Sequence, residues 1–508
     1  MTSKSKIMNR DEIFSVRHLE SNLKEHSVKS AAVTIIAQAF KVVLQIGFIA
    51  LLSRLLSPND FGLIAMIAVV TALGMTLLDG GLSMATVQRA TITHTQVSNL
   101  FWINISLGIL LTLVVAAASP LMSWLYGEDS LLFPMLALSS TFLIGSFVVQ
   151  HEAILKRRMQ FKALSTIDLC SVTVGNTVGV IFAYKGFSYW SLVFATISTF
   201  VVRVVMTWWV VGWIPSFYQK SSEIGALVGF GANLTGVNFV NYFTNNITPF
   251  SIGIIGGANA LGLFDRSFRL ASIPKNQALM PVLKVLQSTL VRVAVDPQKL
   301  ENLTISLMSK LSLITFLISL VMFLSAEWIV LTLLGESWVE AIAIFKLLSI
   351  ATIATPITTL TAMSLVAMGQ AKALLKWKII TFSILLMALI IGSFWGMWGL
   401  LFGVTLSALF IRVPLFFIYA AHYLPIKAKQ LFLAIASPLL ISLFLGLLFE
   451  LFVINLLPSH SLVSIGLYVF FIPAVYIFLC LIIKSTRRDV IELVGLIRDN
   501  LKLSKFTK

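Results

Sequence analysis

The chain has 508 residues, of which 58% are hydrophobic and only 11% are charged, and its formal net charge is +16 at pH 7. Soluble globular domains are roughly 25% charged, so this composition excludes a set of ordinary soluble domains and indicates a membrane-embedded protein. The two cysteines lie in apolar stretches and the six histidines in connecting segments. We therefore expect no disulfide framework, no metal site and no cofactor.

The first 30 residues form a polar tail ahead of the first apolar stretch. The tail contains four acidic residues and has no short apolar core followed by a small-residue cleavage site. It is therefore not a secretory signal, and the first span is expected to direct insertion itself.

Fourteen apolar stretches follow, and most approach or exceed the roughly 20 residues that a helix needs to cross the hydrocarbon core. The sequence thus predicts an all-α polytopic membrane protein with fourteen transmembrane helices. The predicted spans are 31–55, 61–78, 97–118, 131–150, 163–183, 189–211, 223–244, 248–264, 301–325, 340–366, 379–393, 398–420, 431–451 and 462–483.

Lysine and arginine outside the spans are distributed very unequally between the two sides. Segments on the side of the N-terminus carry 30 of them, whereas the opposite side carries only Lys185 and, at the outer end of the first span, Arg54. Because cytoplasmic segments are enriched in these residues, both termini are predicted to be cytoplasmic. The positive charge is thus mainly a topology signal, and nucleic-acid binding is not expected. Residues 281–295 and 487–505 are predicted to form basic amphipathic helices on the cytoplasmic surface.

Five cations lie inside the apolar stretches, which contain almost no acids to neutralise them. Each Lys or Arg at a span centre costs about 2.5–3.5 kcal/mol to insert. Several of the five are therefore predicted to face a water-filled interior suited to anionic substrates. They are Lys41, Arg203, Lys310, Lys346 and Arg412.

Some of these cations have an alternative interpretation. Arg203, Arg412 and Lys310 are close enough to the cytoplasmic ends of their spans to snorkel to the interface. Lys346 is near the outer end of its span. Asp168 is expected to form a structural ion pair with Arg203, and proton coupling is the alternative role for that carboxylate.

The chain contains an internal repeat. Residues 59–63 match residues 259–263 at an offset of 200, and Arg203 with its neighbours matches Arg412 with its neighbours at an offset of 209. Two six-helix lobes in the same orientation are therefore predicted, with two helices appended. The boundaries are 31–218 for the N-lobe, 219–430 for the C-lobe, 431–483 for spans thirteen and fourteen, and 484–508 for a basic cytoplasmic tail.

Polar stripes occur on the first helix of each predicted lobe. Single amides in membrane helices often only bond to neighbouring helices, but matched stripes on both lobes favour a lined cavity in which amides bind sugar hydroxyls and Lys41 attracts phosphate. The stripe residues are Thr34, Gln38, Lys41 and Gln45 in span one, and Asn238, Asn241 and Asn245 in span seven.

Three segments resemble polysaccharide flippases of the multidrug/oligosaccharidyl-lipid/polysaccharide exporter superfamily, in particular their Wzx-like branch. The segments are residues 51–62 (LLSRLLSPNDFG), 79–83 (DGGLS) and 261–270 (LGLFDRSFRL). The resemblance implies two lobes with alternating access and an undecaprenyl-pyrophosphate-linked oligosaccharide as cargo. It also implies residence in the bacterial inner membrane.

Three classes of function remain open from the sequence. The resemblance favours a flippase without covalent chemistry, acting on a lipid-linked anionic oligosaccharide within membrane lipids, beside a polymerase and glycosyltransferases of the same pathway. An integral-membrane polysaccharide polymerase or glycosyltransferase is one alternative, although the outer loops are short. A multidrug or small-solute antiporter is the other, although Lys41 and the lack of an acid in span one argue against cationic drugs.

Overall fold

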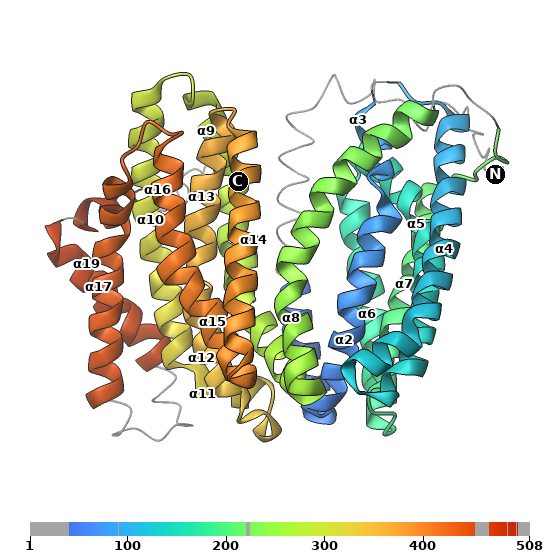
Figure 1. Ribbon diagram of the computed structural model, residues 1–508, viewed down its shortest axis with the longest axis horizontal. Helices are drawn as coiled ribbons and strands as arrows, with labels where there is room; N and C mark the ends of the chain where they lie inside the picture. The colour runs from blue at the N-terminus through green and yellow to red at the C-terminus, as the bar shows by residue number, and fades with distance from the viewer. Residues whose placement is uncertain are drawn as a thin grey trace, which may run out of the picture. The chain divides into compact units, whose positions relative to one another are not determined.

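The computed structural model describes residues 40–89, 91–219, 224–452, 467–484, 486–493 and 495. These residues form helices and no strand (Figure 1). Eleven helices in the described part are long and apolar enough to cross a membrane. The predicted all-helical, multi-pass architecture is therefore confirmed. Thr34 and Gln38 lie outside the described residues.

The chain divides into two compact units between Gly262 and Leu263. The first unit contains a helix at residues 40–55 and most of α8. Its elements are α2 (Pro58–Asp79), α3 (Leu82–Gln88), α4 (His94–Tyr126), η3 (Asp129–Leu131), α5 (Leu132–Arg157), α6 (Phe161–Tyr184), α7 (Trp190–Val211) and α8 (Ile224–Pro274).

The second unit begins within α8 and contains the remaining elements. They are η4 (Lys275–Leu279), α9 (Met280–Val293), α10 (Pro297–Leu324), α11 (Ala326–Leu333), η5 (Glu336–Trp338), α12 (Ala341–Ala351), α13 (Ala354–Ala367), α14 (Ala371–Ser393), α15 (Gly396–Leu406), η6 (Ser407–Arg412), α16 (Val413–Ala421), α17 (Ala428–Phe452), η8 (Leu467–Phe471) and α19 (Ile472–Ile482). Residues 486–493 are also helical.

The junction between the first two helices is built by a capping box. The Ser57 side chain accepts a hydrogen bond from the Asp60 amide at 3.3 Å, and the Asp60 carboxylate accepts one from the Ser57 amide at 2.9 Å. Pro58 occupies the first helical position, where its missing N–H costs nothing. The short motif at residues 57–60 thus fixes where α2 begins.

The equivalent junction in the second repeat lies at Gly257, where the backbone of α8 leaves the helical conformation with φ +73°. Gly257 stands 200 residues after Ser57, so the repeat offset holds at this turn. The predicted boundary between spans seven and eight, at residues 245–247, is therefore wrong. Asn245, Asn246 and Pro249 read as turn residues in sequence, yet they lie inside continuous helix, because glycine provides the positive φ that the turn requires.

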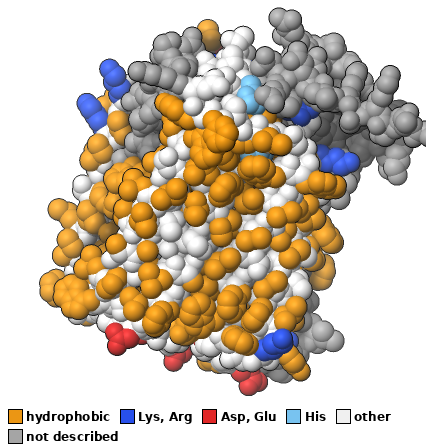
Figure 2. All heavy atoms as spheres, turned by 90° about the vertical axis from the view of Figure 1, so that its right-hand side faces the viewer, with side chains coloured by type: hydrophobic (Ala, Val, Ile, Leu, Met, Phe, Trp, Pro, Cys, Tyr) orange, Lys and Arg blue, Asp and Glu red, His pale blue; other side chains and the backbone are white. Residues whose placement is uncertain are grey.

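The structure agrees with the predicted position of the amphipathic helix that follows α8. Residues 281–295, predicted as an amphipathic helix, are helical from Met280 to Val293, with Leu283 and Leu290 fully buried and Val285 exposed. Asp79 ends α2, and its carboxylate accepts a hydrogen bond from the Ser83 amide. The outer face of the first unit is mostly apolar, with acidic side chains only along the lower edge in Figure 2. Such a band suits contact with lipid.

Candidate anion-binding site

Two helices of the first unit pack closely enough to bring their polar side chains together. On α6, Gly175 and Gly179 face α7, and a Cβ atom added to Gly175 would lie 1.9 Å from Oγ1 of Thr199. A Cβ atom on Gly179 would lie 2.9 Å from Cβ of Ala195. Glycines spaced by four residues allow membrane helices to approach each other closely. The same two helices carry Asp168 and Arg203.

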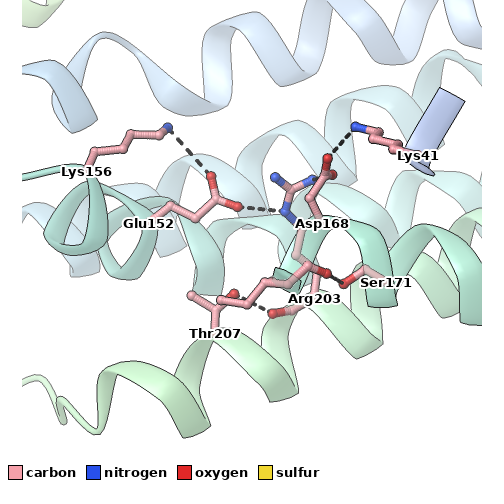
Figure 3. A network of polar contacts seen from close by, with 8 residues as sticks. Lys41, Glu152, Lys156, Asp168, Ser171, Arg203 and Thr207 are labelled. Atoms are coloured by element: carbon pink, nitrogen blue, oxygen red, sulfur yellow. Dashed lines mark hydrogen bonds and ion pairs between the residues drawn. The ribbon is translucent and has the colours of Figure 1, made fainter. Parts of the chain in front are cut away.

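These side chains belong to a network of five charged residues, which we call the N-unit ion network (Figure 3). Lys41 donates to the carboxylate of Asp168. Nε of Arg203 lies 2.6 Å from Oε1 of Glu152, and Nη1 of Arg203 lies 3.7 Å from Oδ1 of Asp168. Nζ of Lys156 lies 3.6 Å from Oε2 of Glu152. Four helices therefore contribute to one cluster: residues 40–55, α5, α6 and α7.

Asp168 and Arg203 of this network lie well inside helices that are long and apolar enough to cross a membrane. Asp168 is seven residues after Phe161, where α6 begins, and Arg203 is eight residues before Val211, where α7 ends. At 1.5 Å per residue, these positions are roughly 10–12 Å inside the helix ends. Charges at this depth persist only when they are paired or face water.

The side chains of the network are accessible in part. The exposed fraction is 30% for Lys41, 28% for Asp168, 32% for Arg203 and 14% for Glu152. Three cations and two carboxylates leave one net positive charge. The arrangement can therefore attract an anion, and a guanidinium next to an ammonium offers donors to phosphate oxygens.

The expected ion pair between Asp168 and Arg203 is present, but the expectation that the span cations have almost no acids near them is wrong. Glu152 escaped notice because the sequence placed it in a cytoplasmic loop after residue 150, whereas α5 continues to Arg157. Glu152 and Lys156 are four residues apart, a spacing typical of opposite charges on one face of a helix, and this spacing was the available signal.

Two further cations of the predicted set also have carboxylate partners, but in the second unit. Nζ of Lys310 lies 2.7 Å from Oε2 of Glu492, in the helical segment 486–493, and 2.9 Å from Oγ of Ser306. Nζ of Lys346 lies 3.4 Å from Oε1 of Glu450. Lys310 thus anchors the C-terminal segment onto α10.

Arg412 differs from the other four cations. One Nη donates to the carbonyl of Val404 at 2.9 Å, whereas its buried Nε has no hydrogen-bond partner among the described residues. No carboxylate pairs with Arg412 in that part of the chain. Arg412 ends η6, a π-helical turn within the span that runs through α15 and α16. Such turns often mark functional positions.

The structure describes the side chains of only some of the predicted amide residues. Gln45 and Asn245 are exposed, and Asn241 is half-buried. The side chain of Asn238 lies outside the described residues, although its backbone is part of α8. Next to Asn241, the buried Tyr242 hydroxyl donates to the carbonyl of Val69 on α2. One edge of the predicted stripe is therefore packed against α2.

A separate cavity of about 700 Å³ lies in the second unit. Its walls come from α10, α17 and the segment 486–493, and they include Ser306, Ser309, Gln430, Asp489 and Glu492. Ser309 donates to Asp489, and Gln430 donates to Glu301 at 2.6 Å. This cavity is distinct from the N-unit ion network and contains none of the predicted site residues.

Comparison with solved structures defines the class of fold. The chain superimposes on the lipid II flippase MurJ in an inward closed conformation with a TM-score of 0.71, over 90% of this chain and 99% of MurJ, at 13% identity. It superimposes on an inward-facing multidrug resistance MATE family transporter of the MOP superfamily with a TM-score of 0.60, over 77% and 95% of the two chains, also at 13% identity. The chain therefore shares the fold of these two structures.

The sequence then identifies the family. The profile described as "Polysaccharide biosynthesis protein" matches residues 51–343, more than half of the chain, and the chain belongs to this family. It is 23% identical over 398 residues to the lipopolysaccharide biosynthesis protein WzxC of Escherichia coli (strain K12), covering 77% of this chain and 80% of WzxC. It is 27% identical over 338 residues to the succinoglycan biosynthesis transport protein ExoT of Rhizobium meliloti (strain 1021), covering 65% and 67%. The resemblance noted in the sequence is thereby confirmed.

Proposed function

We propose that the protein is a flippase for a lipid-linked oligosaccharide. The cargo is an undecaprenyl-pyrophosphate-linked repeat unit of an exopolysaccharide, a colanic-acid-like polymer or an O-antigen. It moves from the cytoplasmic to the periplasmic leaflet of the bacterial inner membrane by alternating access. No covalent bond is made or broken, so the protein is a transporter and not an enzyme.

The observation that carries this proposal is the N-unit ion network at membrane depth, in a fold shared with a lipid II flippase. Lys41 and Arg203 provide cationic donors, and Arg203 lies about 12 Å inside the end of α7, where an unpaired charge is costly. The names of WzxC and ExoT support a polysaccharide precursor as cargo.

The finer architecture belongs to the same proposal. Fourteen spans with both termini in the cytoplasm agree with the 30 Lys and Arg on one side. The two lobes would be residues 31–218 and 219–430. In this arrangement Lys41 and Arg203 bind the diphosphate, Arg412 provides a second anion contact, and the amides bind glycan hydroxyls. The amides are Gln38, Gln45, Asn238, Asn241 and Asn245, and the hydroxyl of Thr34 belongs to the same set. Lys310 acts through its contact with the C-terminal segment.

The partners proposed are the lipid-linked cargo and, in the cell, a polymerase and glycosyltransferases that act on the same glycan. Glycosyltransferase genes next to the coding sequence would support this pathway. A labelled lipid-linked oligosaccharide in proteoliposomes tests the function directly. Translocation with no change in glycan length is expected. Chain elongation would indicate an enzyme, and export of organic cations without lipid movement would indicate a multidrug antiporter.

A further inference from the structure

The cations of the N-unit ion network already form ion pairs with carboxylates of the same network (Figure 3). Asp168 accepts a hydrogen bond from Lys41 and lies 3.7 Å from Arg203, so it bridges the two cations. Glu152 binds Arg203 on the other side at 2.6 Å. An incoming anion therefore has to displace an internal one before it reaches either cation.

This competition between internal carboxylates and incoming anions is important because every phospholipid of the surrounding bilayer has a phosphate in its headgroup. Each phospholipid carries a phosphodiester group with one negative charge, and unpaired cations at Lys41 and Arg203 would attract these groups as well as the cargo. Discrimination between two ligands often requires an element that disfavours the wrong one. An internal carboxylate that competes for the same donors is such an element.

We propose that Asp168, assisted by Glu152, determines the specificity of the site by excluding single phosphodiester groups from Lys41 and Arg203. The inference rests on the proposed function and adds the reason for its selectivity. Asp168 acts here as an internal counterion, and only a ligand that satisfies both cations together displaces it.

A diphosphate fulfils this condition because its two linked phosphoryl groups each carry negative charge. One group can bind Lys41 while the other binds Arg203, so both contacts of Asp168 are replaced at once. A single phosphodiester replaces one contact and leaves a displaced carboxylate near the remaining cation. An unpaired charge at this depth is costly, so the exchange is unfavourable.

The partial exposure of the network is consistent with such an exchange. Asp168 is 28% exposed and Lys41 30%, so an anion can reach the pair without unfolding α6. Glu152, at 14%, is more enclosed and holds Arg203 in place while Asp168 moves away. Lys156 binds Glu152 from the exposed side at 3.6 Å and keeps that carboxylate neutralised.

The test compares two fluorescent lipids in proteoliposomes that contain the full chain. One lipid carries a diphosphate-linked oligosaccharide and the other is phosphatidylglycerol. Asp168→Asn is expected to raise phosphatidylglycerol translocation about tenfold over the unaltered protein, the order of change for losing one contact to a charged group. Glu152→Gln, which leaves the pair of Lys41 and Asp168 intact, should give a smaller rise. Asp129→Asn, at an exposed position on η3, is the matched acid-to-amide control.

A double variant, Lys41→Gln with Asp168→Asn, separates competition from a simple loss of charge balance. The double variant removes the cation together with its counterion, so the rate of phosphatidylglycerol translocation should return toward that of the unaltered protein. Unchanged selectivity in Asp168→Asn, or in Glu152→Gln if the former does not assemble, would overturn the inference. Failure of the unaltered protein to move the diphosphate lipid would overturn the proposed function instead, and the two results are therefore distinguishable.

Discussion

Gly62 and Gly262, which occupy matched positions of the internal repeat, pack directly against each other's helix. A Cβ atom on Gly62 would lie 1.6 Å from the carbonyl oxygen of Ala258, and one on Gly262 would lie 1.8 Å from the carbonyl oxygen of Pro58. The offset of 200 relates Pro58 to Ala258 as it relates Gly62 to Gly262. The two halves of the contact are therefore related by the repeat. Because each glycine lacks a Cβ atom, the backbone of the other helix can approach it to van der Waals distance.

Gly62→Ala is predicted to destabilise the protein although alanine favours helix in isolation. The added methyl group meets backbone atoms that cannot rotate away, so the helices must separate, at a cost of about 1–3 kcal/mol or more. Thermal unfolding of the purified protein in detergent measures the loss. Gly47→Ala is the matched control, because nothing lies within 4 Å of its added Cβ atom. Equal melting temperatures for the two variants would contradict the packing described above.

Much of the fold could be predicted from the sequence. The apolar spans and the unequal distribution of Lys and Arg are properties of local composition, and the internal repeat is visible when the chain is compared with itself. The turn at Gly257 was misplaced because Gly257 lies within the predicted span 248–264, and the φ angle that makes it a turn cannot be read from the sequence. The site was predicted less well. Lys41, Asp168 and Arg203 could be named in advance, but Glu152 was not, because α5 extends beyond the apolar stretch that marked its span. Which charges meet depends on how helices pack, as Gly175 shows.

Lys41→Ala is predicted to slow translocation of the lipid-linked oligosaccharide by about 10- to 100-fold, the range expected for one charge-assisted contact. Insertion and expression should stay normal, because Asp168 keeps Arg203 as a partner. Lys185→Ala, at an exposed position directly after α6, is the control. The initial rate in proteoliposomes is the measurement, and equal rates for both variants would remove Lys41 from the cargo path.

Substitution of Arg203 and substitution of Arg412, which are related by the repeat, are predicted to change the stability of the protein differently. Arg203→Gln leaves Glu152 and Asp168 with fewer cations and should lower the free energy of unfolding by about 1–2 kcal/mol. Arg412→Gln removes a guanidinium whose Nε is buried without a partner among the described residues, so stability should be unchanged or higher. Both variants should transport more slowly. The prediction fails if Arg412→Gln is the less stable of the two in thermal unfolding.

Acid is predicted to release the C-terminal segment from α10. Hydrogen bonds from Lys310 and then Arg488 lower the pKa of Glu492 from 4.5 to about 2. A carboxylate with a depressed pKa stabilises the folded state above its unfolded value, and that contribution is lost as the pH falls from 4.5 toward 2. Asp489, which accepts a hydrogen bond from Ser309, lies in the same helical segment.

Comparison with Glu492→Gln isolates the contribution of Glu492 from that of Asp489 and the other acids. The variant should melt at a lower temperature than the unaltered protein at pH 7, because the amide cannot form the ion pair with Lys310. The difference between the two melting temperatures should shrink below pH 4.5 and nearly vanish toward pH 2. A difference that stays constant down to pH 3 would mean that Lys310 does not hold the segment through this carboxylate.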